Sequence, residues 1–258
     1  MQKLQVLDLF SGIGGFSLGL ERTGGFETAA FCEIEDFPRQ VLARHWPEVP
    51  CYEDVRTLTA ARLAANGIAK IDVITGGFPC QDVSTAGRQA GIGEGTRSGL
   101  WSEIVRLVRE IRPKFVIVEN VANLLRGPVE QPGRWFGRIL GDMAECGYDA
   151  EWENIPAAAV GAPHRRERIW IVAYPNEKPL AGQILGGNLS KSNEWEFLQT
   201  HDLLDVERWL EQIPDSYRVS ESDGFSDFMA ALGACGNAVV PQIPELIGWG
   251  ILEVGAKA

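Results

Sequence analysis

A cysteine that follows a predicted strand is the residue of this chain best suited to covalent chemistry. Residues 71–76 are rich in β-formers, a Gly-Gly turn ends the run, and Pro79-Cys80 comes next. Ligands of open α/β sheets bind in the crevice beyond the carboxyl ends of the strands, where a nucleophile can reach them. Most free cysteines are instead small buried hydrophobes. Because 81–95 is rich in glycine and polar residues, as surface loops are, we interpret Cys80 as a candidate nucleophile.

A carboxylate and two arginines could share that crevice. The buried-strand pattern of 115–118 ends in Glu119, which would place an acid or base beside Cys80. The alternative role of Glu119 is to cap the next turn through backbone N–H groups. Alternation along a strand puts Arg166 and Arg168 on one face if their strand begins early. Surface arginines are usually just solvated, so this pattern alone does not indicate a site.

A glycine-rich turn follows the first predicted strand. Residues 4–10 have the pattern of a buried parallel strand, and 11–15 turn the chain into a helix. Glycines let a ligand approach the backbone closely, and Asp8 and Phe10 sit at the strand end where they can contact it. Glu33 lies about 20 residues beyond the turn, where dinucleotide-type folds place a carboxylate on ribose hydroxyls.

The turn favours one kind of cofactor over another. Ser17 stands where the third glycine of G-x-G-x-x-G would be, which argues against a pyrophosphate and suits a nucleoside without one, such as S-adenosylmethionine. Asp54 would lie on the same sheet edge as Glu33, placed to accept from an adenine amino group. An equally weighted alternative is that Asp54 caps a helix over 57–66.

Strand-like and helix-like patterns alternate along the chain, which predicts one α/β domain with a mostly parallel sheet. Strands are expected over 4–10, 26–31, 52–55, 71–76, 115–118, 149–155 and 168–174, and helices over 16–20, 36–45, 57–66, 100–111, 134–146 and from 243 on. Residues 175–207 lose this periodicity and predict a loop-rich insertion.

Composition restricts the class of protein. The 258 residues are 45% apolar and carry a formal charge of −11, which argues against a general nucleic-acid binder but allows a local basic cleft. Five cysteines without a C-x-x-C pair indicate no disulfide framework and no metal site. No apolar run reaches the roughly 18 residues of a membrane span, so we expect a soluble cytoplasmic protein. The basic residues cluster at Arg88, Arg97, Arg106 and Arg109, and at Arg165, Arg166 and Arg168.

Together these residues resemble the DNA (cytosine-5)-methyltransferase family, in particular its short phage and prophage members. The similar stretches occur in the family's order and cover 4–174 and 212–254. They are Asp8-Leu9-Phe10-Ser11-Gly12-Ile13-Gly14-Gly15, Gly77-Phe78-Pro79-Cys80-Gln81, Arg97-Ser98-Gly99-Leu100-Trp101, Glu119-Asn120-Val121, Arg165-Arg166-Glu167-Arg168-Ile169, Pro214-Asp215-Ser216-Tyr217 and Gly236-Asn237-Ala238-Val239-Val240.

The resemblance implies a Rossmann-like methyltransferase fold and a covalent reaction. The Cys80 thiolate would add to carbon 6 of a flipped-out cytosine, so that carbon 5 can take the methyl group. Glu119 would hold or protonate N3, and Arg166 and Arg168 would fix the carbonyl oxygen and orient the ring or the loop. Closure of the 81–98 loop would accompany base flipping.

The resemblance also implies an S-adenosylmethionine pocket. Ile34 occupies a position that is often aromatic in the family, so we expect weaker stacking on adenine. The implied pocket residues are Phe10, Gly12, Gly14, Gly15, Glu33, Ile34, Asp54, Val55, Pro79, Leu100, Asn237 and Val239.

The chain is expected to comprise a catalytic and cofactor-binding part (1–174), a reduced target-recognition insertion (175–211) and a C-terminal segment that returns to the catalytic part (212–258). His164 replaces the usual glutamine before the arginines. Major-groove readout needs several positioned side chains, so the short insertion predicts relaxed or very short sequence specificity on double-stranded DNA. Restriction-modification and phage self-protection are both compatible settings.

Two alternatives stay open at this stage. The chain could be an inert relative that binds cofactor or DNA, or one that needs a separate specificity partner. It could also methylate structured RNA, which is read largely by shape. Cys80, Glu119, Arg166 and Arg168 are all present, which favours the active DNA enzyme because an inert copy would have no reason to keep all four.

Overall fold

The structure is a computed structural model, and it describes most of the sheet and its helices. The described residues are 2–78, 100–126, 133–162, 165–177, 180, 182–185 and 237–257.

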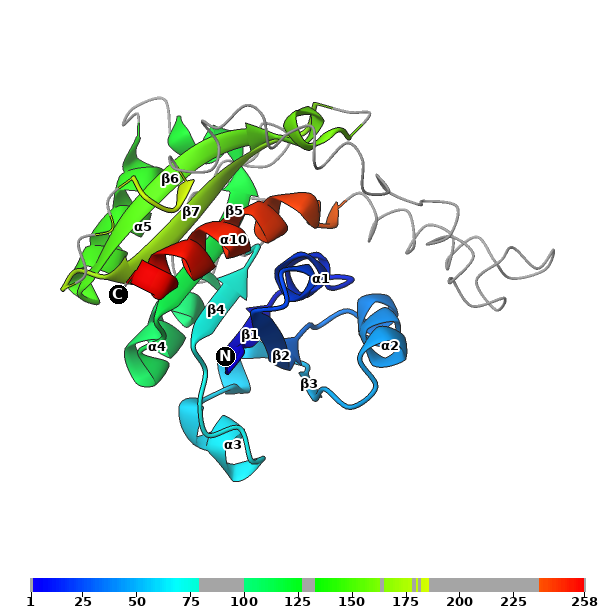
Figure 1. Cartoon of the computed structure of the whole chain (residues 1–258). Helices are drawn as coiled ribbons and strands as arrows, with labels where there is room; N and C mark the ends of the chain where they lie inside the picture. The colour runs from blue at the N-terminus through cyan, green and yellow to red at the C-terminus, as the bar shows by residue number, and fades with distance from the viewer. Residues whose placement is uncertain are drawn as a thin grey trace.

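Seven strands form one sheet in the order β3-β2-β1-β4-β5-β7-β6 (Figure 1). The pairings from β3 to β5 are parallel, whereas β7 runs antiparallel to both of its neighbours. The strands are β1 Leu4–Leu9, β2 Phe26–Cys32, β3 Cys51–Tyr52, β4 Val73–Gly76, β5 Phe115–Val121, β6 Tyr148–Pro156 and β7 Glu167–Pro175. The expectation of a mostly parallel sheet is confirmed.

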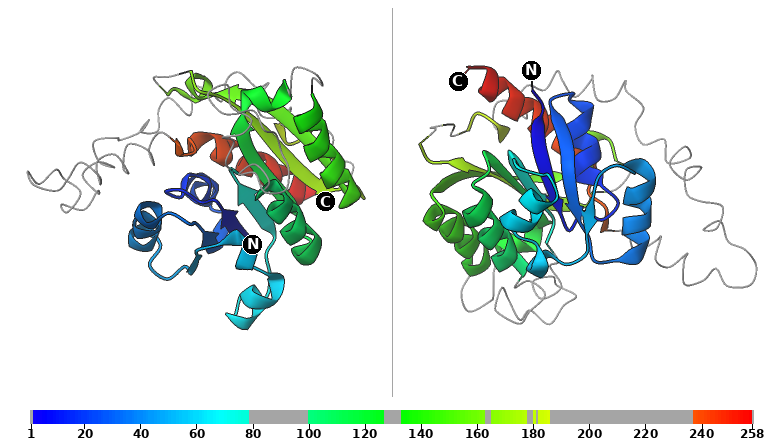
Figure 2. Two further views of the ribbon diagram at one scale, coloured as in Figure 1. Left: turned by 180° about the vertical axis from the view of Figure 1, so that it is seen from behind. Right: turned by 90° about the horizontal axis from the view of Figure 1, so that it is seen from below.

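Helices cover both faces of this sheet (Figure 2). Side chains of α3, α4 and α5 join the core on one face, and side chains of α1 and α10 join the core on the other. The helices are α1 Gly15–Arg22, α2 Asp36–His45, α3 Ala60–Ala65, α4 Trp101–Ile111, α5 Arg134–Glu145 and α10 Gln242–Lys257, with short 3₁₀ turns η1 Val55–Thr57, η3 Ala122–Leu125 and η4 Ala157–Val160.

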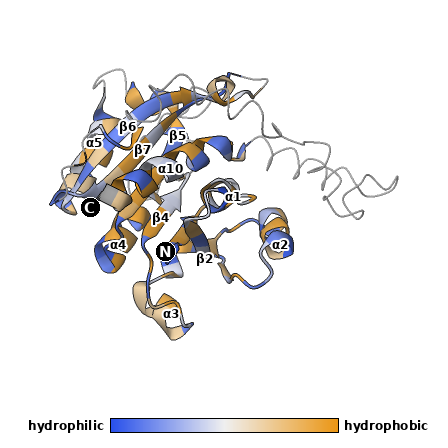
Figure 3. Ribbon diagram, in the orientation of Figure 1, coloured by the Kyte–Doolittle hydropathy of each residue, from blue (hydrophilic) through white to orange (hydrophobic). Residues whose placement is uncertain are grey.

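Hydropathy explains which elements lie inside. All four residues of β4 are buried, as expected for a central parallel strand covered on both faces. Helix α4 instead alternates hydrophobic and hydrophilic residues (Figure 3), and its apolar stripe, including Ile104 and Leu107, is buried. The helix ends where Arg112 takes φ 56, because the following Pro113 disfavours helical geometry in the residue before it.

The segment that leads into α10 lies directly on α1. A Cβ on Gly15 would lie 2.4 Å from the carbonyl oxygen of Val239, and one on Gly19 would lie 2.1 Å from that of Pro241. No side chain fits at either place, so these glycines allow two backbones to approach closely. The chain therefore returns, after more than two hundred positions, to the helix that follows the glycine-rich turn.

Several element boundaries differ from the sequence expectation, those of β5, β7 and α3 among them. β5 continues to Val121 because its last residue pairs with Arg168 of antiparallel β7, so Glu119 lies inside the strand and not at its end. β7 begins at Glu167, one residue earlier than expected. The helix expected over 57–66 is shortened to α3, which Thr59 caps by accepting from the backbone N–H of Arg62.

Candidate active site

The glycine-rich turn adopts backbone angles that few side chains tolerate. Gly12 has φ 52 and Gly14 has φ 87, in the left-handed region where glycine carries no steric cost. Phe10 is one of the non-glycine residues in this region, with φ 52. Ser11 braces the turn, because its hydroxyl donates to the carbonyl oxygen of Asp8 over 2.6 Å.

Glu33 reaches the turn as its spacing predicts. Its Oε2 accepts a hydrogen bond from the Gly12 N–H over 2.8 Å, and its Oε1 accepts one from the Glu35 N–H over 2.9 Å. The carboxylate is buried, whereas the adjacent Ile34 is 63% exposed. Glu33 and Gly12 therefore meet just beyond the ends of β1 and β2, with Ile34 exposed next to Glu33.

Asp8 does not line the crevice, contrary to the expectation from its place near the end of β1. It is fully buried, and its two carboxylate oxygens accept from Ser17 Oγ over 2.8 Å and from Thr75 Oγ1 over 2.7 Å. Burial raises the pKa of Asp8 to about 7, against the lowering effect of these hydrogen bonds. Ser17, which replaces the third glycine, thus has a structural role behind the turn that its sequence position did not reveal.

Asp54 caps a turn, although not the expected one. Its Oδ1 accepts from the backbone N–H of Arg56 over 2.9 Å, at the start of η1. The Arg56 guanidinium also pairs with this carboxylate at 2.8 Å, and its hydrogen bonds hold the pKa of Asp54 below the usual range. The side chain of Asp54 remains 29% exposed, so capping and contact with a ligand are compatible.

The remaining expected pocket residues fall into two groups. Val55 is buried in the core that Leu100 and Phe10 pack against, so these three lie on the same side of the sheet. Val239 contacts Gly15 through its backbone carbonyl oxygen. Asn237, two positions before Val239 in the chain, is exposed. Pro79 lies outside the described residues.

A second polar cluster lies on β5 and β7. Arg168 Nε is 2.9 Å from Glu119 Oε1, and the Glu119 side chain is 12% exposed. Burial raises the pKa of Glu119 more than Arg168 and Arg166 lower it. Arg166 is itself partly desolvated, which lowers its pKa, as does the nearby Arg168 charge. The structure thus brings together the carboxylate and both arginines singled out in the sequence.

The end of β4 faces this cluster. The backbone of Gly77 lies against Glu119, since a Cβ there would be 3.4 Å from Oε2. Asn120 Nδ2 donates to the carbonyl oxygen of Phe78 over 3.2 Å, which fixes the chain as it leaves the sheet. Cys80 lies outside the described residues, two positions after Phe78. The capping role weighed for Glu119 is not observed, because η3 has no side-chain cap.

The basic cluster expected from Arg106 and Arg109 is partly neutralised. Arg106 pairs with Glu103 and Glu110 at 2.8 Å each, and Arg109 pairs with Glu145 at 3.3 Å. Arginines bound in this way on one helix do not form a cationic surface for nucleic acid. The spacing of Glu103, Arg106 and Glu110 at i, i+3 and i+7 is the signal that could have revealed this.

The described residues offer neither a cluster of metal ligands nor a membrane-spanning helix. No group of three or more His, Cys, Asp or Glu side chains is placed to hold a metal ion in the described part of the chain. No helix among the same residues is long and apolar enough to cross a membrane.

The family model for C-5 cytosine-specific DNA methylase matches residues 4–229. Among curated relatives, the Type II methyltransferase M2.BsuMI of Bacillus subtilis is 33% identical over 180 residues, 68% of this chain and 43% of the relative. M.Sau3AI of Staphylococcus aureus is 34% identical over 188 residues, 69% of this chain and 45% of the relative. This chain thus spans less than half the length of these two relatives.

Solved structures show the same fold. A DNA modification methyltransferase encoded within an E. coli prophage aligns with a TM-score of 0.58 and 27% identity, over 70% of this chain and 50% of that one. DNMT2 of Spodoptera frugiperda aligns with a TM-score of 0.55 and 20% identity, over 69% and 51% of the two chains, which is a likeness of fold. Since the family model covers most of the chain and M.Sau3AI is 34% identical over 69% of it, the chain belongs to the C-5 cytosine-specific DNA methylase family.

Proposed function

We propose that this protein transfers a methyl group from S-adenosylmethionine to carbon 5 of cytosine in double-stranded DNA. The observation that supports this most directly is the partly buried ion pair of Glu119 and Arg168, with Arg166 nearby and the backbone of Gly77 against Glu119. Gly77 precedes Cys80 by three positions, so the candidate nucleophile follows directly from the strand end that faces the acid.

Each group of this cluster has a task in the reaction. The Cys80 thiolate would add to carbon 6 of the base, so that carbon 5 attacks the sulfonium methyl group and S-adenosylhomocysteine leaves. Removal of the proton from carbon 5 by a base would then expel the thiolate and restore the ring. Glu119, whose pKa burial raises, would donate a proton toward N3 as negative charge develops there. Arg168 would orient Glu119, and Arg166 would hold the carbonyl oxygen of the ring. Because a stacked cytosine cannot reach these groups, the base must leave the duplex.

The residues around the glycine-rich turn fit the methyl donor. S-adenosylmethionine, when bound, supplies an electrophilic methyl group. Glu33 would accept from the ribose hydroxyls, since its carboxylate already lies at the turn and its remaining lone pairs can accept further donors. Exposed Ile34 would cover one adenine face, and Asp54 would accept from the adenine amino group. Gly12, Gly14 and Gly15 would let the donor approach the backbone.

The chain organisation supports a catalytic domain with an insertion. β7 ends at Pro175 and the segment before α10 packs on α1, so the described residues on either side of 186–236 belong to one fold. We infer that 175–211 contains the target-recognition region and that its length limits specificity. The bacterial origin of the named relatives fits action on DNA in the cytoplasm of a bacterial or phage-infected cell.

Transfer of labelled methyl groups tests the proposal. Wild-type protein should label cytosine in duplex DNA and form a covalent adduct with DNA that contains 5-fluorocytosine, and Cys80→Ala should do neither. Bisulfite sequencing of DNA from expressing cells then reports the target. Wild-type labelling no higher than that of Cys80→Ala would refute the proposal. Labelling of tRNA in preference to duplex DNA would assign the RNA alternative, and activity only after adding cell extract would assign a specificity partner.

A further inference from the structure

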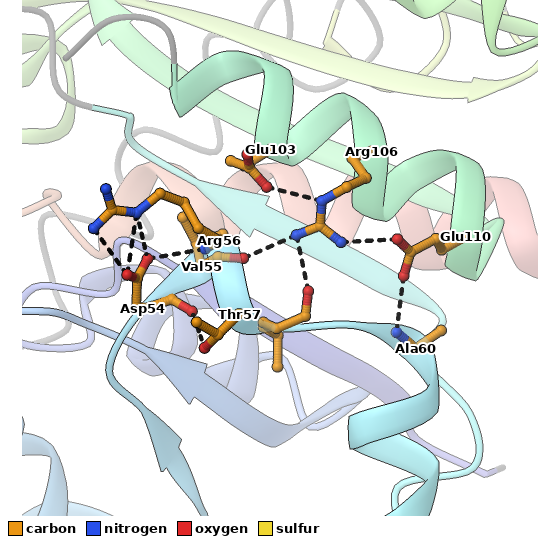
Figure 4. Close-up of polar contacts among 9 residues, drawn as sticks. Asp54, Val55, Arg56, Thr57, Ala60, Glu103, Arg106 and Glu110 are labelled. Carbon is orange, nitrogen blue, oxygen red and sulfur yellow. Dashed lines mark hydrogen bonds and ion pairs between the residues drawn. The ribbon is translucent and has the colours of Figure 1, made fainter. Parts of the chain in front are cut away.

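Arg106 joins helix α4 to the segment that carries Asp54 (Figure 4). Its Nη2 donates to the carbonyl oxygens of Val55 over 2.9 Å and of Leu58 over 2.8 Å. These carbonyls lie at the first residue of η1 and at its C-cap. One guanidinium nitrogen therefore holds both ends of the turn that Asp54 caps.

Two carboxylates fix the orientation of this guanidinium. Arg106 Nε donates to Glu103 Oε2 and Nη1 to Glu110 Oε1, each over 2.8 Å. Glu110 also accepts from the backbone N–H of Ala60 over 3.0 Å, so α4 is tied to the start of α3 as well. Burial lowers the pKa of Arg106, but the two carboxylates raise it more, which keeps the guanidinium charged. Charge-assisted hydrogen bonds of this kind are the stronger ones in proteins.

The turn that Arg106 holds cannot define its own position. η1 is a single turn of three residues, and isolated turns of this length are unstable. Val55 and Leu58 anchor the two ends of the turn by burying their side chains, and the two carbonyl contacts fix the backbone at these same two residues. They act on the backbone that directly follows Asp54, so they set where the Asp54 carboxylate points.

We propose that Arg106 is a positioning residue for the adenosyl end of the methyl donor, acting through η1 on Asp54. This inference rests on the proposed function, in which Asp54 accepts from adenine. Arg106 contributes little to the core, because the buried face of α4 is formed by Trp101, Ile104 and Leu107, each 0% exposed. Its removal should therefore affect the cofactor more than the fold.

The test compares Arg106→Gln with Arg109→Gln on the same helix. Arg109 is 55% exposed and pairs with Glu145 alone among the described residues, so it controls for loss of one charge from α4. We expect Arg106→Gln to raise the KM for S-adenosylmethionine about tenfold, the size expected for losing one or two charged hydrogen bonds. The kcat and the KM for DNA should stay within about twofold of wild type, as should all constants of Arg109→Gln.

The split between KM and kcat separates positioning from a merely structural role. A variant that only lost stability would lose active enzyme and hence apparent kcat, with an unchanged KM. In the double variant, the fold-increases in KM caused by Asp54→Ala and Arg106→Gln should not multiply, because both substitutions act through Asp54. If Arg106→Gln does not fold, Glu103→Gln should raise the same KM to a smaller extent, because Arg106 loses one of its two orienting carboxylates.

Three outcomes would overturn the inference, and they differ from failure of the proposed function. The first is a KM for S-adenosylmethionine that is raised in Asp54→Ala but unchanged in Arg106→Gln, which would show that Arg106 does not position Asp54. If Arg106→Gln does not fold, an unchanged KM in Glu103→Gln would show the same. Multiplying effects in the double variant would show that Arg106 acts elsewhere. An unchanged KM in Asp54→Ala would remove the inference together with that assignment of Asp54. Failure of the proposed function would instead appear as wild-type protein without methyl transfer.

Discussion

Glu119 and Arg168 form an ion pair across β5 and β7 although they are not opposite each other in the sheet. Glu119 lies opposite Trp170, and Arg168 lies opposite Val121, so the 2.9 Å contact is a diagonal one on a single face. Diagonal neighbours are within reach only of long side chains, which is why an arginine makes the contact. The arrangement exists because β7 pairs antiparallel with β5, whereas the strands from β3 to β5 are parallel.

Glu119→Gln should nearly abolish methyl transfer while leaving the fold intact. Glutamine keeps the shape but cannot donate a carboxyl proton, and general acids contribute at least about 100-fold to turnover. We expect kcat to fall by roughly that factor or more with an unchanged KM for S-adenosylmethionine, measured by labelled methyl transfer. Glu145→Gln, on the exposed surface of α5, is the control. A fall of less than about tenfold in Glu119→Gln would contradict the assigned role.

Arg168→Met should move the pH dependence of turnover. Arg168 lowers the pKa of Glu119, so its removal should raise that pKa further. Activity that needs protonated Glu119 is present below its folded pKa and is lost as pH rises through it. The pH at which kcat falls should therefore be higher in Arg168→Met than in wild type, and the maximum kcat should be lower. A fall at the same pH or at a lower pH would exclude Glu119 as the titrating acid.

Asp8 should make stability depend on pH in a range where few groups titrate. Its folded pKa of about 7 lies above the ordinary 3.8, so its contribution to stability is full below about pH 4 and is lost as pH rises through about 7. Relative to Asp8→Asn, wild type should lose roughly 4 kcal/mol of unfolding free energy over this window, at most. Urea unfolding at several pH values measures the difference. Asp36→Asn, at an exposed position of α2, retains Asp8 and should therefore keep the loss of stability that Asp8 causes over this window.

Gly19→Ala should destabilise the contact between α1 and the segment before α10. A methyl group at Gly19 would meet the Pro241 carbonyl oxygen at 2.1 Å, so one backbone must move. Overpacking of this kind costs about 1–3 kcal/mol. Gly141→Ala in α5 is a matched control, since nothing lies within 4 Å of its added Cβ, and it should stabilise by about 0.5–1 kcal/mol. Equal midpoints in urea for the two variants would contradict this difference.

The parts of the site that the sequence predicted are those defined within one strand-turn-helix-strand unit. Glu33 meets Gly12 because both follow neighbouring parallel strands, whose ends are level in any such unit. Glu119 was expected at the end of its strand, but it lies inside β5. The extension of β5 depends on β7, about fifty positions away, and local propensity carries no information on that pairing.

Other features depend on tertiary contacts and could not be predicted. Arg106 looked like a member of a basic surface, yet its carbonyl partners lie 51 and 48 positions earlier in the chain. Asp8 was expected to face a ligand. A strand that is buried on both faces shows no alternation of polar and apolar residues, so its sequence does not indicate which way each side chain points. Only the packing of Ser17 and Thr75 around it shows that its carboxylate points inward.

The docking of Val239 on Gly15 has a consequence for biosynthesis. The first strand, the glycine-rich turn and Glu33 leave the ribosome early, but the backbone that seals the adjoining side of α1 is translated after every strand of the sheet. A nascent chain can thus form its sheet before this backbone covers α1. The close packing at Gly15 is therefore a late event of folding, because it waits for residues more than two hundred positions downstream.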